Sequence, residues 1–112
     1  MKIRMITLGL FALLLVNCEK IDKDLPDCIR TKIKEFAKTP ICKNEASVAL
    51  YVFQSKNVYV FSEGTCGADL GATVYDENCE NLGYLGGLTG NLMINGVKFH
   101  ENAEFQREVW HD

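Results

Sequence analysis

Four cysteines, Cys28, Cys42, Cys66 and Cys79, are spaced so that they could form covalent links between distant parts of the chain. No two of them form a C-x-x-C pair or lie close enough in sequence to begin a zinc site, so we expect neither a redox centre nor a bound metal. An even set of cysteines in a short chain predicts two structural disulfides in an oxidising compartment. Of the three pairings that four cysteines allow, we favour Cys28–Cys79 and Cys42–Cys66.

The histidines and acidic residues do not predict a catalytic or cofactor site. His100 and His111 are the only histidines, and neither accompanies a G-x-S-x-G motif or an identifiable third group of a triad. The acids and the asparagine of residues 76–80 could offer oxygen ligands to calcium, but they lack the EF-hand order and suit an ordinary turn. We therefore predict no catalytic residue, no metal and no cofactor.

Residues 1–17 have the pattern of a signal peptide. Lys2 and Arg4 precede an apolar run over residues 5–16, which is shorter than the roughly 20 residues of a membrane-spanning helix. The run ends in LLLVNC, which fits a lipobox whose cysteine is Cys18, except that Asn17 stands where a small residue is usual. We expect cleavage before Cys18 and attachment of lipid to it, with a plain secreted product as the alternative.

The cysteine count supports the lipid independently. The chain has five cysteines, and an odd cysteine in an exported protein needs an explanation, which a lipid on the sulfur of Cys18 provides. Several acyl chains on one protein give stable membrane anchoring, whereas a single chain binds reversibly. We expect residues 18–24 to form a lipidated tether and residues 25–112 to form a single domain.

The pattern of residues 25–112 predicts an α+β domain, with one N-terminal amphipathic helix packed on an antiparallel sheet of short strands. Residues 24–38 predict the helix, because their apolar side chains recur at helical spacing. Strands are predicted at residues 46–54, 57–61, 70–75 and 81–85, with a hairpin at 92–94 and 97–99 around Asn95-Gly96. Residues 105–110 suit a helix or a strand. We favour a strand, since the preceding hairpin offers an edge for pairing.

The first predicted hairpin is apolar on both faces, so each face must be covered by the protein or must bind something. One hypothesis is that its four aromatic residues form a single exposed stripe, which would be a candidate interaction surface: Tyr51, Phe53, Tyr59 and Phe61. The alternative is that they belong to the core, covered by Phe105 and Trp110.

Charge is distributed unevenly along the chain. Lys2 and Arg4 are two of the 12 basic residues, so residues 18–112 keep 10 of them against 15 acidic residues, a net charge of −5. This balance argues against nucleic acid as a partner. Residues 19–43 have a net charge of +2 and residues 44–112 of −7. A solvated helix face explains the basic part simply, and contact with anionic headgroups is the alternative.

The chain from Leu25 to Trp110 resembles a family of small lipoproteins from Gram-negative bacteria that is described only as a domain of unknown function. The likeness rests on the segments LPDCI, ASVALYVFQ, NVYVF, GTCGAD, ENCENLGYLGGLTGN, ING and the closing F-x-x-x-V-W. The resemblance implies a fixed cysteine framework and a C-terminal strand. It implies no catalytic residues, cofactor or substrate.

We therefore expect a non-enzymatic binding or structural module of the bacterial cell envelope, anchored by Cys18 to the outer membrane, at its periplasmic face or on the cell surface. Its partners would be the membrane and a protein or another envelope ligand. One alternative is an inhibitor of a secreted hydrolase, which would need residues 62–69 to form a protruding, rigid loop. The other is a small hydrolase, which would need His100 beside an acid and a nucleophile.

Overall fold

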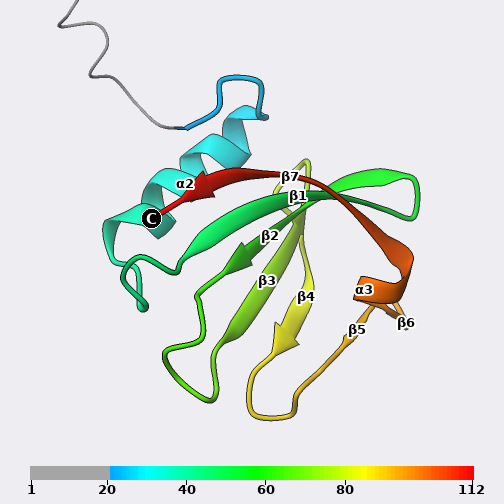
Figure 1. Ribbon diagram of the computed structural model, residues 1–112. Coiled ribbons are helices and arrows are strands. Elements are labelled where there is room, and N and C mark those ends of the chain that lie inside the picture. Colours follow the sequence, from blue (N-terminus) through cyan, green and yellow to red (C-terminus); the bar gives the residue numbers. More distant parts are fainter. Residues whose placement is uncertain (1–20) are drawn as a thin grey trace, which may run out of the picture.

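The main sheet has five antiparallel strands in the order β4-β3-β2-β1-β7, and a helix lies across one of its faces (Figure 1). The computed structural model describes residues 21–112, so the predicted signal peptide 1–17 and Cys18 lie outside the described residues. The elements in chain order are α2 (Asp27–Lys38), β1 (Ser47–Phe53), β2 (Lys56–Ser62), β3 (Gly71–Asp76), β4 (Asn81–Gly86), β5 (Met93–Ile94), β6 (Val97–Lys98), α3 (Phe99–Asn102) and β7 (Ala103–His111). The expected α+β class with an antiparallel sheet is confirmed. Neither described helix is long and apolar enough to cross a membrane.

Helix α2 covers one face of the sheet. Ile29 and Ile33, one turn apart, are fully buried against a core that includes Val48, Phe61 and Trp110. The ring of Phe36 meets the rings of Phe61 and Trp110 edge to face, with centroids 5.4 and 5.8 Å away. The helix begins at Asp27 and not at residue 24, because residues 22–24 form a turn in which the Asp22 carboxylate accepts the Asp24 backbone N–H.

The expected tether, residues 18–24, extends too far at its C-terminal end. Ile21 packs against the core under α2, and Leu25 is buried. Asp22 also makes an ion pair with Arg107 of β7. Residues 21–24 therefore belong to the folded domain.

The C-terminal segment is a strand, as predicted, but its partner differs from the expected one. The preceding hairpin of β5 and β6 has only two residues in each strand, so it offers little edge for pairing. The short helix α3 turns the chain back, and β7 pairs with the free edge of β1, with bulges on either side of the Ala49–Leu50 segment. β7 is thus an edge strand, and its bulges and charged side chains oppose pairing with further strands.

The hypothesis of a single aromatic stripe is wrong. The turn between β1 and β2 consists of Gln54 and Ser55, and a two-residue turn pairs odd positions of one strand with even positions of the next. Tyr51 therefore lies opposite Val58, and Tyr59 lies opposite Leu50 on the other face. Tyr51 and Phe53 belong to the face away from α2, while Tyr59 and Phe61 belong to the core under α2. All four except Tyr51 are buried.

Two disulfides join the parts of the domain. Cys28 at the start of α2 is bonded to Cys79 in the turn between β3 and β4, with their Cα atoms 6.1 Å apart. Cys42, after α2, is bonded to Cys66 in the loop between β2 and β3, with a Cα separation of 5.7 Å. This is the pairing that the sequence favoured.

Both disulfides should matter to stability, because they close loops of 51 and 24 residues in the unfolded chain. Replacing either pair by alanines is expected to lower the free energy of unfolding by about 3 to 4 kcal/mol. Urea denaturation followed by circular dichroism measures this loss. A double variant within about 1 kcal/mol of the wild type would contradict the expectation for that bond.

Candidate functional site

The face of the sheet away from α2 is only partly covered. A second core occupies one end of this face, where Ile94 and Phe99 cover Phe53, Val58 and Val74. These two covering residues come from β5 and α3. At the other end of the same face no helix or strand lies over the sheet among residues 21–112 (Figure 1). Residues at this end of the face line a groove.

The groove has a volume of about 410 Å³, within the usual range of ligand sites. Its floor consists of one residue from each of the strands β1 to β4: Ala49, Val60, Ala72 and Leu85. The loop between β2 and β3 forms one wall, with Thr65 and Leu70, and the segment after β4 forms the other, with Asn91 and Leu92. Tyr51 and His100 close the end near the second core. The lining is mainly apolar.

Small side chains create the hollow. Ser47, Ala49 and Ala72 stand where larger side chains would fill the space over the sheet. Gly71 is required by close approach of β3 and β4, since a Cβ there would lie 2.0 Å from the carbonyl oxygen of Leu85. A side chain at position 71 would therefore require β3 and β4 to move apart.

The wall formed by residues 63–70 is exposed yet held in place. The Cys42–Cys66 disulfide fixes its middle. The Glu45 carboxylate accepts hydrogen bonds from the backbone N–H of Thr65 at 2.8 Å and from its hydroxyl at 3.0 Å. The backbone donor and then the hydroxyl lower the pKa of Glu45, against a smaller opposing effect of desolvation. Glu45 is thus a charged anchor for this wall.

The opposite wall is held by Asn91. Its side-chain amide donates to the carbonyl oxygens of Tyr84 at 2.8 Å and Met93 at 3.0 Å, and its backbone pairs with Gly86. Two leucines of this segment stand in solvent: Leu88 is 86% exposed and Leu92 is 57% exposed. Leu92 lines the groove, so an exposed aliphatic side chain lies at its edge.

His100 lines the groove without the neighbours that catalysis would need. It is exposed, and its ring contacts those of Phe99 and Tyr51, with centroids 5.2 and 6.0 Å away. Within residues 21–112 its side chain makes no hydrogen bond or ion pair with an acid or a hydroxyl. The register of β7 places His111 opposite Ser47, beside the groove but on a different strand.

The acidic turn at residues 76–80 has a backbone role. The Asp76 carboxylate accepts the backbone N–H groups of Asn78 and Glu80, each at 2.9 Å. No group of three or more His, Cys, Asp or Glu side chains in the described part of the chain is arranged to hold a metal ion.

The groove itself was not predicted from the sequence, although its Tyr51 belonged to the proposed aromatic stripe. The signal that could have revealed it is the alternation of Ser47, Ala49 and Tyr51 along β1, which places small residues and then a large one on one face. Neighbouring strands also contribute small residues to the lining, with Gly71 and Ala72 from β3 and Gly86 from β4.

Comparison with known protein families gives one match. A family profile described as Domain of unknown function (DUF6970) matches residues 34–112, which is more than half of the chain. This confirms the resemblance to a domain of unknown function. The match starts inside α2, so it does not extend to Cys18. The comparisons with curated proteins and with solved structures found no match.

The role of Glu45 predicts a pH-dependent wall. The pKa of Glu45 is lowered in the folded state. The stability that the Glu45 carboxylate gives to the folded wall is therefore complete above the ordinary glutamate pKa of about 4.3, and it is lost as pH falls through the lower folded pKa. The amide NMR signal of Thr65 should therefore shift at acid pH, and Glu45→Gln should abolish that titration. Glu63→Gln, in the same loop, is the control and should leave it intact. A Thr65 signal that titrates unchanged in Glu45→Gln would contradict this role.

Proposed function

Because the chain belongs to the DUF6970 family, whose description names no activity, we propose its function from its own residues: it is a non-enzymatic binding module of the bacterial cell envelope, anchored by a lipid on Cys18. The groove on the open face of the sheet is its binding site, and its ligand is an extended apolar segment of a partner protein. The observation that carries this proposal is a largely apolar groove whose two walls are held by a disulfide and by hydrogen bonds.

Cys18 is supported as the lipid site by the use of the other cysteines. Cys28, Cys42, Cys66 and Cys79 all take part in disulfides, so Cys18 is the fifth and unmatched cysteine of the chain. It also follows directly after the predicted signal peptide. The outer membrane, at its periplasmic face or on the cell surface, is the proposed location.

A protein segment suits the groove better than a lipid chain. The hydroxyl groups of Ser47 and Ser62 lie among the apolar lining residues, whereas the side chains of Thr65 and Asn91 already make hydrogen bonds within the walls. Groups of this kind lose their water when a ligand covers the groove, and each loss is costly unless a new hydrogen bond replaces it. A peptide backbone supplies both donors and acceptors, whereas an acyl chain supplies none.

An enzymatic role is not proposed, because no side chain within residues 21–112 is placed to activate a nucleophile in the groove. The hydroxyl groups of Ser47, Ser62 and Thr65 line it, and His100 stands at one end. A nucleophilic mechanism needs the base hydrogen-bonded to the hydroxyl and oriented by a third group. The contacts of His100 in the described residues are with aromatic rings.

A second candidate function is inhibition of a secreted hydrolase through residues 62–69. The observation that favours it is that residues 65–69 of this loop are exposed while the Cys42–Cys66 disulfide and Glu45 hold it. A loop held in one conformation loses little entropy on binding. Its side chains are small, however, and the residues that dominate interfaces are large aromatic residues and arginine. The groove is therefore the leading candidate.

The lipid anchor is tested by metabolic labelling with a fatty-acid analogue in a Gram-negative host. Wild-type protein should be labelled, and Cys18→Ser should lose the label because its hydroxyl does not accept the lipid. Asn17→Gly, which restores the usual lipobox, is the matched control and should keep the label or increase it. Label that persists in Cys18→Ser would refute attachment at this residue.

Binding in the groove is tested by Ala49→Phe, which places a ring on the floor. Soluble domain from residue 19 onward should capture a partner from envelope extract, and Ala49→Phe should reduce the captured amount at least tenfold, a loss of about 1.4 kcal/mol. Thr31→Phe adds the same ring on the far side of the sheet and should bind normally.

The same experiment distinguishes the two candidates. A partner that Ala49→Phe still captures, but that Ala68→Trp in the exposed loop loses, would move the binding site from the groove to residues 62–69. Thermal unfolding of each variant shows that the added ring has not disrupted the fold.

A further inference from the structure

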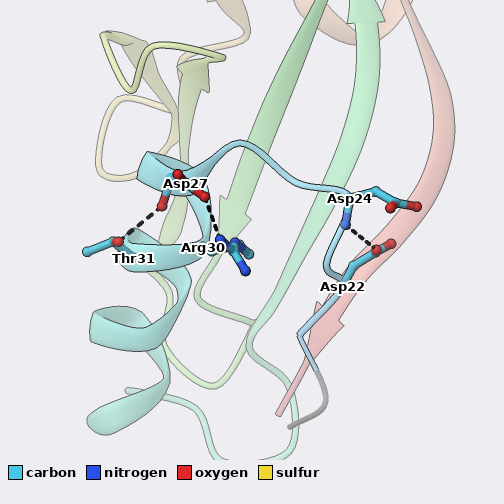
Figure 2. A network of polar contacts seen from close by, with 5 residues as sticks. All are labelled: Asp22, Asp24, Asp27, Arg30 and Thr31. Atoms are coloured by element: carbon cyan, nitrogen blue, oxygen red, sulfur yellow. Dashed lines mark hydrogen bonds and ion pairs between the residues drawn. The ribbon is translucent and has the colours of Figure 1, made fainter.

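The folded domain begins almost at the proposed lipid. Ile21 packs against the core under α2, and Asp22 makes an ion pair with Arg107. The Asp22 carboxylate also accepts the backbone N–H of Asp24 (Figure 2). The inference about how the domain lies on the membrane rests on the proposed lipid at Cys18. Only residues 19–21 separate that cysteine from Asp22.

Chain geometry limits how far the domain can stand from the membrane. Four residue steps join the Cα atoms of Cys18 and Asp22, and a fully extended chain spans at most about 3.6 Å per step, or about 14 Å in all. This upper limit is just under twice the Debye length of about 8 Å at physiological ionic strength, and a link that is not fully extended brings Asp22 within one Debye length. The part of the domain around Asp22 is therefore held close to the lipid headgroups.

That part of the domain lies beside α2, on the helix-covered side of the sheet (Figure 1). The basic residues of the described chain concentrate there: residues 21–43 contain six, and residues 44–112 contain three. Acidic residues show the opposite distribution, with four and ten in the same two segments. An anionic surface would attract the first segment and repel the second.

Several of these cations are not used inside the domain. Asp27 pairs with Arg30 (Figure 2), Glu35 pairs with Lys38, and Asp22 pairs with Arg107. Within residues 21–112, Lys23, Lys34 and Lys43 make no ion pair and are exposed. Lys32 lies 4.4 Å from the centroid of the Tyr75 ring and likewise has no carboxylate partner in this part of the chain.

We infer that the exposed side of α2, together with residues 21–24, lies on the surface of a bilayer that contains anionic phospholipid, and that the groove on the opposite face of the sheet opens away from the membrane. The short link to the lipid places this side of the domain next to the bilayer, and the attraction between its lysines and the anionic headgroups keeps it there. A partner would then approach the groove from the aqueous compartment, without competition from the lipid surface.

Native lysines report this orientation directly. Lipidated full-length protein, purified from a Gram-negative host, is placed on vesicles of phosphatidylcholine with 30% phosphatidylglycerol or of phosphatidylcholine alone (about 0.3 and 0 mole fraction of anionic lipid). A water-soluble acetylating reagent is applied, and mass spectrometry measures the rate at each lysine. On the anionic vesicles Lys34 and Lys38 should react about fivefold more slowly than in the unlipidated Cys18→Ser protein. Lys56 and Lys98, on β2 and β6, should react equally in both.

Charge variants test the role of the lysines. Lys32→Gln combined with Lys34→Gln should return Lys38 and Lys43 toward their rate in solution. Lys56→Gln combined with Lys98→Gln removes the same charge elsewhere and should leave the protection of Lys38 unchanged. Lys34, Lys56 and Lys98 are exposed, and Lys32 loses only its contact with the Tyr75 ring, so both double variants should stay within about 1 kcal/mol of the stability of the wild type.

The outcomes separate this inference from the proposed function. Protein that fails to float with any vesicle has no lipid anchor, and the inference falls with the anchor. Protein that floats but whose Lys34 reacts as fast as in Cys18→Ser keeps the anchor and overturns the orientation. Equal protection on vesicles with and without phosphatidylglycerol overturns recognition of anionic headgroups.

Discussion

A sheet that is apolar on both faces needs cover on both faces, and within residues 21–112 there is a single three-turn helix for the purpose. β1 and β2 supply Val48 and Phe61 to one face and Phe53 and Val58 to the other. Helix α2 spans about 18 Å, given 12 residues at 1.5 Å each, so it can cover one face of the central strands and no more. The form of the groove follows from this shortage of covering structure.

The second face is completed by short elements that cover only one end of it. β5, β6 and α3 together hold Ile94 and Phe99 over the sheet, and the chain then returns as β7 to the edge of β1. Beyond them the partly exposed residues of the floor are Ala49 and Ala72, while its larger residues Val60 and Leu85 are buried, which limits the apolar area left in contact with water. An uncovered floor of large aliphatic residues would cost about 25 cal/mol per Å² of apolar surface. The groove is the arrangement that leaves a face open at a tolerable cost.

The sequence predicts the elements of this fold better than it predicts their arrangement. The spacing of Ile29 and Ile33 identifies the helix face, and Asn95-Gly96 identifies a tight hairpin, because both are local patterns. The face on which Tyr59 lies depends on the number of residues in the turn before it, and the aromatic stripe hypothesis failed there. The pairing of β7 with β1 depends on where α3 directs the chain. The groove combines residues from four strands, two loops and α3, so no single segment of sequence predicts it.

Each disulfide holds a different face of the sheet: one fixes α2, and the other fixes a wall of the groove. Cys28–Cys79 ties the start of α2 to the turn after β3, so it holds the helix on the side that carries the basic residues. Cys42–Cys66 ties the chain after α2 to the exposed loop that forms a wall of the groove. A loop of exposed Gly, Ala and Asp residues buries too little apolar surface to stay in one conformation by itself. The Cys42–Cys66 disulfide and the hydrogen bonds to Glu45 therefore hold this loop in one conformation. Because Cys42 follows α2, the wall of the groove is attached to the helix that is packed on the opposite face.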